Sequence, residues 1–468
     1  MAVAADKSMD WIQTSIGSPA SFVMSMARDL QGRVWIGTED EGVFCLDSAA
    51  TDGQMTNYTA ENGLGDDSAY AIACDKLGRI WVGTLNHGVS VYNGVRWQNY
   101  SAVADKDHNI LAGPLGDRVF AIAISPVDGD VWIATDAGLT RYSVQKDSWS
   151  YITQDDGLPS DQTSSLAFAS DGTLYVGTQC DGIAIAGPND NYQAWRVVTG
   201  PEQLPMIAEG SGLPGCLVNC LLVQTNGTVL AGTNGGLASS SDKGKTWQFI
   251  RGQDYPAKVN DGYPPVSWQN DTDITDESLM PEDHITSLAQ DNQGRIWIGT
   301  WRKGFEVFDA PLLTALYTGG FTKSKQGTGK FITAILPLGN DQTIVASYGT
   351  GVAKVGDDSN MPDNGVPDPL DPSRDLPDVL RRHDAGIQLQ QRLLQQRIEH
   401  RPGLAPPQLR RLRCDDMLPT DFGRIPDERV LNAARFCAQT RFHFSLAGSL
   451  ITLGREIRIT SCMPRMLF

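Results

Sequence analysis

The sequence of 468 residues contains no run of 18 apolar residues, and therefore no candidate for a membrane-spanning helix. Basic residues are scarce: 38 Lys and Arg stand against 55 Asp and Glu, which gives a net charge of −17. Nucleic acids and anionic membrane surfaces would repel so acidic a chain. We therefore expect neither of them as a partner and no direct membrane span.

Complete metal-binding and phosphate-binding motifs are also missing. Cys216 and Cys220 are not accompanied by the second Cys or His pair that a zinc site requires. The acidic segment 270–277 lacks the glycine and terminal glutamate spacing of an EF-hand, so a solvated loop is the better interpretation. Residues 327–330 match only part of a phosphate-binding loop. We expect no metal and no cofactor, and structural roles for the five cysteines before residue 359.

One sequence motif, which we call the phrase, recurs seven times at intervals of 43 to 67 residues. It consists of a short apolar run that ends in Gly-Thr or a close variant, a few variable residues, and usually a glycine followed by an alternating segment. Such a period marks a repeat architecture, whose units bury their apolar faces against one another. The seven copies are Gly32–Thr38, Gly78–Thr84, Asp130–Thr135, Thr173–Thr178, Thr228–Thr233, Gly294–Thr300 and Thr343–Tyr348.

Each repeat contains short segments rich in β-branched and aromatic residues, separated by turn residues, which predicts a four-stranded antiparallel sheet with strands A to D. Aspartates such as Asp29 and Asp75 begin the A–B turns and are interpreted as turn formers rather than ligands. Seven such sheets predict an all-β, seven-bladed β-propeller over residues 1–358. Asp10–Ile16 looks like a D strand without a sheet, so we expect it to close the last blade against Gly351–Val355.

The phrase Gly-Arg-Ile-Trp-Ile-Gly-Thr and the segments at Asn62–Leu64, Asp156–Pro159 and Ser211–Pro214 resemble the two-component regulator propeller repeat. The resemblance implies the sensor region of bacterial hybrid two-component and related sensor kinases, many of which detect polysaccharide fragments. It also implies a sensor kinase or another protein as a partner. Ser240–Trp247 further matches the Asp-box hairpin, which stabilises a turn and carries no chemistry.

The C-terminal part differs in composition. A linker rich in Pro and Asp is expected at 359–378, and the tail at 379–468 contains many Arg, Leu and Pro residues. From residue 360 onward there are 16 Arg and no Lys, which is a marked compositional shift. Either the tail is a small module with a helix near 379–400, or it is disordered or translated from a shifted frame.

Candidate binding residues follow the B strands, because the B–C turns and the D–A loops of a propeller emerge on one face. Amide, carboxylate and aromatic side chains there suit sugar recognition, and Trp301 next to two cations is the sharpest candidate. Polar loops can equally be polar because they face water. The predicted set comprises Glu39, Asp40, Glu41, Asn86, His87, Asp136, Gln179, Asp181, Asn234, Trp301, Arg302, Lys303 and Tyr348.

We therefore expect a non-catalytic ligand-sensing or binding propeller, with a carbohydrate or another small molecule as its ligand and no catalytic residues. One alternative is a propeller enzyme, such as a glycosidase, sialidase or lyase; the other is a protein-docking scaffold. Only three histidines and ten arginines precede residue 359, which gives a lyase or a sialidase little to use. The start, Met1–Ser8, lacks the features of a signal peptide. The family favours a piece of a longer periplasmic or extracellular chain over a cytoplasmic protein.

Overall fold

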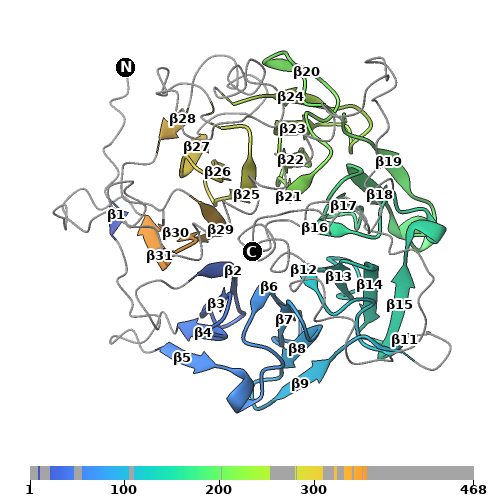
Figure 1. Ribbon diagram of the computed structural model, residues 1–468, viewed down its shortest axis with the longest axis vertical. Coiled ribbons are helices and arrows are strands. Elements are labelled where there is room, and N and C mark those ends of the chain that lie inside the picture. Colours follow the sequence, from blue (N-terminus) through green and yellow to red (C-terminus); the bar gives the residue numbers. More distant parts are fainter. Residues whose placement is uncertain are drawn as a thin grey trace, which may run out of the picture. The chain divides into compact units, whose positions relative to one another are not determined.

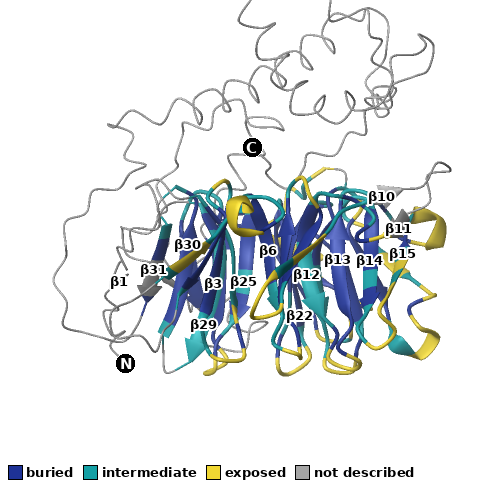
Figure 2. Cartoon of the chain, turned by 90° about the horizontal axis from the view of Figure 1, so that it is seen from below, coloured by how far each residue is buried: buried dark blue, intermediate teal, exposed yellow. Residues whose placement is uncertain are grey.

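The computed structural model describes residues 9–10, 22–46, 55–104, 110–201, 203–252, 280, 282–308, 321–323, 331–339, 342–349 and 351–355. Seven antiparallel sheets stand radially around one axis (Figure 1), which confirms the predicted all-β, seven-bladed propeller. The strands are largely buried, and exposed residues gather in the loops (Figure 2). The predicted linker at 359–378 and the tail at 379–468 lie outside the described residues.

The four strand positions follow one another outward from the axis. The A strands are β2 (Val23–Arg28), β6 (Ala69–Cys74), β12 (Val119–Ile124), β16 (Thr163–Phe168), β21 (Val218–Val223), β25 (Ile285–Gln290) and β29 (Ile332–Gly339). The B strands are β3 (Val34–Thr38), β7 (Ile80–Thr84), β13 (Val131–Thr135), β17 (Leu174–Thr178), β22 (Val229–Thr233), β26 (Ile296–Thr300) and β30 (Gln342–Ser347). The C strands are β4 (Val43–Leu46), β8 (Val89–Tyr92), β14 (Gly138–Ser143), β18 (Ile183–Ala186), β23 (Gly236–Ser240), β27 (Phe305–Phe308) and β31 (Gly351–Val355). The D strands of blades 1 to 6 are β5 (Met55–Tyr58), β9 (Trp97–Tyr100), β15 (Ser148–Ile152), β19 (Arg196–Val198), β24 (Gln248–Ile250) and β28 (Phe321–Lys323).

The seventh blade receives its outer strand from the N-terminal end. Strand β1 (Met9–Asp10) pairs antiparallel with β31, so that Met9 lies opposite Val355 and Asp10 opposite Lys354. The expected ring closure is therefore confirmed. The described strand begins one residue earlier than predicted, and the rest of the predicted segment, 11–16, lies outside the described residues.

Two strand pairings were not predicted. Strand β20 (Glu209–Ser211) adds a fifth strand to blade 5 by pairing with β24. Strands β10 (Val103–Ala104) and β11 (Ile110–Ala112) form a separate two-stranded ribbon between blades 2 and 3. Both arise in long D–A connections, where the sequence has no repeated pattern that would reveal a short strand.

A repeated clasp anchors the A–B turns to the tryptophan of the phrase. In blade 2, Asp75 Oδ1 accepts the backbone N–H groups of Leu77 and Arg79 at 2.9 Å. Its Oδ2 accepts the Arg79 guanidinium at 2.5 Å and the indole N–H of Trp81 at 2.9 Å. Blades 1 and 6 repeat this clasp around Asp29 and Asp291. The interpretation of these aspartates as turn formers is confirmed, with the tryptophan as a further partner.

In blades 2, 5 and 6, the glycine of Gly-Thr packs closely against the next blade. A Cβ atom on Gly83 would lie 2.8 Å from the Cβ of Val119, the first residue of the next A strand. The same contact recurs at Gly232, where an added Cβ would lie 2.5 Å from the Cγ2 of Ile285, and at Gly299. The glycine therefore allows adjacent sheets to approach closely.

Side-chain hydrogen bonds also join the blades near the axis. Every A strand shifts register between its first and third residues, so each has a bulge around its second residue. A bulge leaves one residue out of the ladder and re-aims its side chain. Four of these second residues donate to the carbonyl oxygen of the first residue in the next A strand: Ser164 to Val218, Asn219 to Ile285, Thr286 to Ile332, and Thr333 to Val23.

Candidate functional site

One face of the propeller is built from two positions in each blade: the residue before strand A and the residue after strand B. In six blades the backbone N–H of the second position donates to the carbonyl oxygen of the first. These pairs are Glu39 with Phe22, Asp136 with Arg118, Gln179 with Gln162, Asn234 with Leu217, Trp301 with His284, and Tyr348 with Phe331, at 2.9 to 3.3 Å. In blade 2, Leu85 N–H donates instead to the Ser68 hydroxyl at 3.1 Å. Because strand A is innermost, these residues form a ring around the axis, which we call the rim (Figure 1).

The B–C turns that carry the rim are held by the threonine of the phrase. Thr84 Oγ1 donates to the carbonyl of Gly88 at 3.0 Å and accepts the backbone N–H of His87 at 3.0 Å. The carbonyl bond recurs at Thr38, Thr135, Thr178, Thr233 and Thr300. A side chain that follows such a turn starts from a fixed backbone, so little ordering is needed when a ligand binds.

Aromatic rings form a continuous row over blades 6, 7 and 1, which we call the aromatic arc. Trp301 packs edge-on with His284 at 4.5 Å between ring centroids and stacks on Phe331 at 5.5 Å. Phe331 contacts Tyr348 at 5.5 Å, and Tyr348 contacts Phe22 at 4.4 Å. Trp301, Phe331 and Phe22 are each partly exposed, whereas Tyr348 is buried. The arc thus presents an apolar surface that belongs to three blades.

Glu39 joins the end of this arc to the polar half of the rim. Its Oε2 accepts the Tyr348 hydroxyl at 2.7 Å. Burial raises the pKa of Glu39 above its ordinary value, against the lowering effect of the Tyr348 hydrogen bond, and neighbouring Asp40 raises it further. Burial and the charge of Glu39 likewise raise the pKa of Tyr348. A carboxylate here is costly unless a donor or a cation compensates it.

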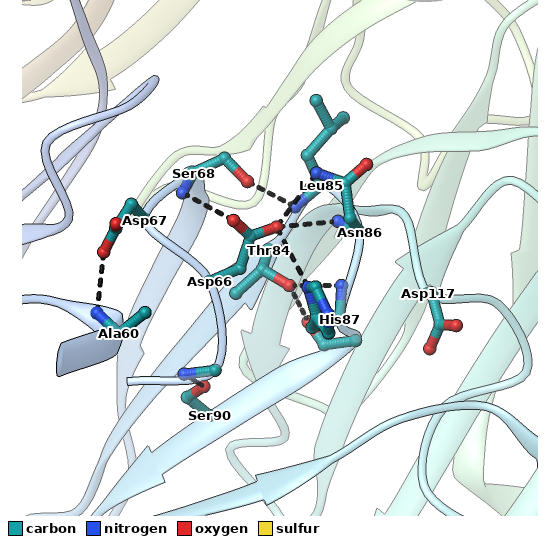
Figure 3. Close-up of polar contacts among 12 residues, drawn as sticks. Ala60, Asp66, Asp67, Ser68, Thr84, Leu85, Asn86, His87, Ser90 and Asp117 are labelled. Atoms are coloured by element: carbon teal, nitrogen blue, oxygen red, sulfur yellow. Dashed lines mark hydrogen bonds and ion pairs between the residues drawn. The ribbon is translucent and has the colours of Figure 1, made fainter. Parts of the chain in front are cut away.

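In blade 2, Asp66 organises the B–C turn on the polar half of the rim (Figure 3). Asp66 Oδ2 accepts the backbone N–H and the side-chain amide of Asn86 at 3.1 and 3.0 Å, and it lies 3.5 Å from the Nδ1 of His87. Burial alone would raise the pKa of Asp66, but hydrogen bonds from Ser68, Asn86 and His87 lower it below the ordinary value. The contacts with Asp66 fix the orientation of Asn86 and His87. Both residues are exposed and therefore accessible to a ligand.

Blades 3 to 5 contribute the remaining polar groups. Asp136 is half-buried, and burial raises its pKa although the charge of Arg118 acts in the opposite direction. Gln179 is buried at the rim, and Asp181 donates its backbone N–H to Thr178 at 3.0 Å. The side-chain oxygen of Asn234 is buried and has no hydrogen-bond partner among the described residues. These four predicted residues therefore lie on one face, as their position after strand B requires.

The structure changes the interpretation of Trp301. It is not an isolated platform, because His284 and Phe331 cover part of its ring. Backbone N–H groups of its neighbours are held by other residues: Arg302 donates to Glu282 at 2.7 Å and Lys303 to Thr300 at 3.1 Å. Arg302 and Lys303 are partly exposed, and Asp40 is exposed at the opposite end of the arc.

Sequence reasoning missed half of the rim. Phe22, Tyr70, Arg118, His284 and Phe331 contribute to this face but were not predicted. All except Tyr70 occupy the position before strand A, and Tyr70 is the bulged residue of β6. The signal was present in the repeat, because the residue before each A strand can be aligned as readily as the residue after each B strand.

The fold, the closed ring and the rim define the class as a seven-bladed repeat propeller. Residues 63–86 and 279–302 match the family model described as the two-component regulator propeller. These two segments match that repeat, which confirms the resemblance drawn from the sequence. A comparison with curated proteins gives no match.

Solved structures share this fold. An extracellular domain assigned to a hybrid two-component system of B. thetaiotaomicron is 19% identical with a TM-score of 0.55, over 75% of this chain and 42% of that one. A domain assigned to a one-component system of the same organism is 20% identical with a TM-score of 0.52, over 75% and 40%. A catalytically inactive virginiamycin B lyase from Staphylococcus aureus is 11% identical with a TM-score of 0.50, over 75% and 99%. The chain thus spans less than half the length of the first two proteins.

Within the described residues, no helix has the length and apolar character needed to cross a membrane. The same residues include no group of three or more His, Cys, Asp and Glu side chains that could hold a metal ion.

Proposed function

We propose that the chain is a non-catalytic sensor propeller, located in the periplasm or outside the cell, that binds a carbohydrate on its rim. The observation that carries this proposal is the aromatic arc of blades 6, 7 and 1, which continues into a rim of carboxylates and amides. A sugar ring presents an apolar face and a hydroxyl-bearing edge, so it needs both kinds of surface side by side. The fold that the chain shares with extracellular sensor domains supports the location.

Several carboxylates near the rim already have structural roles, which supports binding rather than catalysis. Asp66 fixes the turn of blade 2. Asp67 accepts the backbone N–H of Ala60 at 2.7 Å (Figure 3). Asp161 accepts that of Gln154 at 2.8 Å, so each aspartate holds a D–A loop. A glycosidase needs a pair of carboxyl groups available on either side of the scissile bond.

The test is binding and turnover by the purified chain, measured with a panel of oligosaccharides by calorimetry and product analysis. Trp301→Ala should weaken binding by about 1 to 3 kcal/mol, because it removes the ring that connects His284 to Phe331. Leu77→Ala is the matched control, since Leu77 is exposed in an A–B turn on the opposite face. Equal losses in both variants would place the ligand elsewhere.

Catalytic conversion of an oligosaccharide would support the enzymatic alternative instead. If the chain converts an oligosaccharide and Asp136→Asn abolishes that conversion without unfolding the protein, the non-catalytic assignment is wrong. The lyase that shares the fold makes this control necessary.

A further inference from the structure

We propose that Glu39, Tyr70 and Tyr348 form a subsite for a cationic group, so that the rim recognises a saccharide that carries an amine. This inference rests on the proposed carbohydrate binding and specifies its chemical class. The three residues come from neighbouring blades: Glu39 follows β3, Tyr70 lies in β6 and Tyr348 follows β30.

Glu39 supplies the negative charge. Its carboxylate accepts the Tyr348 hydroxyl at 2.7 Å, which uses one of about four acceptor positions on the two oxygens. None of the ion pairs between described residues includes Glu39. A half-buried carboxylate with spare acceptor positions is stabilised when a cation with several N–H donors reaches it.

Tyr70 supplies a second, independent observation. It is 9% exposed, and its hydroxyl is buried without a hydrogen-bond partner among the described residues. Buried hydroxyl groups in proteins nearly always have a partner, so an exception calls for an explanation. The pKa of Tyr70 is raised by burial first and then by the charge of Glu39, which indicates that the hydroxyl lies close to that carboxylate.

The backbone explains how Tyr70 reaches this position. The ladder between β6 and β7 pairs Ala69 with Thr84 and Ala71 with Gly83, so Tyr70 is the bulged residue. In blades 4 to 7 the bulged residue donates to the next blade. Tyr70 has no such bond to Val119 among the described residues, and its hydroxyl lies beside Glu39 instead, where it lowers the pKa that burial raises.

The surroundings favour a cation over a neutral hydroxyl group. Phe22 lies 4.4 Å from Tyr348, and aromatic rings beside a carboxylate attract ammonium groups. After Glu39, the charge that acts most strongly on Tyr70 is that of Arg118, which also acts on Asp136, whereas Asp40 and Asp66 add negative charge to that of Glu39. An incoming ammonium group would thus meet an excess of carboxylates on the Glu39 side.

Three oligosaccharides with the same backbone linkage test the inference: oligomers of glucosamine, of N-acetylglucosamine and of glucose. Binding is measured by calorimetry at neutral and at mildly acidic pH, because the sugar amine must be protonated while Glu39, whose pKa is raised, must stay ionised. We expect the glucosamine oligomer to bind about tenfold more tightly than the glucose oligomer, as one desolvated cation–aromatic and charge contact would give. N-acetylation should remove this preference because it removes the charge.

Glu39→Gln should abolish the preference for the amine, and Tyr70→Phe should reduce it. Glu61→Gln is the matched control, because it makes the same substitution at an exposed carboxylate outside the rim and should leave the preference intact. A preference that survives Glu39→Gln, or equal binding of the three oligomers, overturns the cationic subsite while carbohydrate binding stands. Binding of none of the three overturns the proposed carbohydrate recognition together with the subsite.

Discussion

Replacing Gly83 by alanine tests whether close contact between blades explains the glycine of the recurring phrase. The added Cβ would lie 2.8 Å from the Cβ of Val119 and closer still to one of its methyl groups, so one sheet must shift. Overpacking of this kind costs about 1 to 3 kcal/mol. The lower entropy of the unfolded chain offsets about 0.4 to 1 kcal/mol of that cost. We expect a net loss of about 1 to 2 kcal/mol in the free energy of unfolding, measured by urea denaturation.

Gly187→Ala is the control, because no atom lies within 4 Å of the Cβ it would add and its φ of −130° suits any residue. That variant should be as stable as the wild type or more stable by up to about 1 kcal/mol, because the same entropy effect applies there without a clash. In a background with Val119→Ala, the cost of Gly83→Ala should shrink, since the clashing methyl groups are gone. Equal effects of Gly83→Ala and Gly187→Ala would refute the explanation from packing.

Three further perturbations probe the clasp, the rim and ring closure. Asp75→Ala leaves the Trp81 indole without its acceptor and breaks an ion pair, so the free energy of unfolding should fall by about 3 kcal/mol; a loss below about 1 kcal/mol would contradict the clasp. The pKa of Glu39 is raised in the fold, and Tyr348, Asp40 and Tyr70 are the groups that face it. Its contribution to stability is therefore fully present below the ordinary pKa and is lost as the pH rises through the raised value. The melting temperature of the wild type relative to Glu39→Gln should fall over that interval, and a constant difference would count against it. Deletion of residues 1–17 removes strand β1 and should lower the melting temperature; an unchanged value would show that closure contributes no stability.

The sequence was sufficient for the architecture because the repeat reports on contacts that recur in several blades. The glycine before Thr84 packs on the next blade, the threonine holds the turn, and Asp75 joins the turn to Trp81. Each of these constraints recurs, so it leaves a periodic trace. Ring closure followed from a strand without a sheet and a sheet without a strand, and β1 paired with β31 in the predicted way.

The site was harder to predict because a binding surface is where repeats diverge. The rim residues that follow strand B could be identified from the sequence. The aromatic arc could not, because it depends on which residues of different blades come into contact. Phe22 and Tyr348 are far apart in the chain, yet their rings lie 4.4 Å apart. Arg302 and Lys303 lie at one end of the arc, whereas Glu39 and Asp40 lie at the opposite end.

Four of the bonds that join successive blades near the axis end on backbone carbonyl groups. Ser164, Asn219, Thr286 and Thr333 differ as donors, but each is accepted by a main-chain oxygen that every residue possesses. A blade can therefore be duplicated, exchanged or mutated on its first residue without losing its neighbour's bond. These hydrogen bonds do not depend on which side chain the accepting residue carries. Whole blades can therefore be recombined during evolution, while the rim residues of each blade change independently.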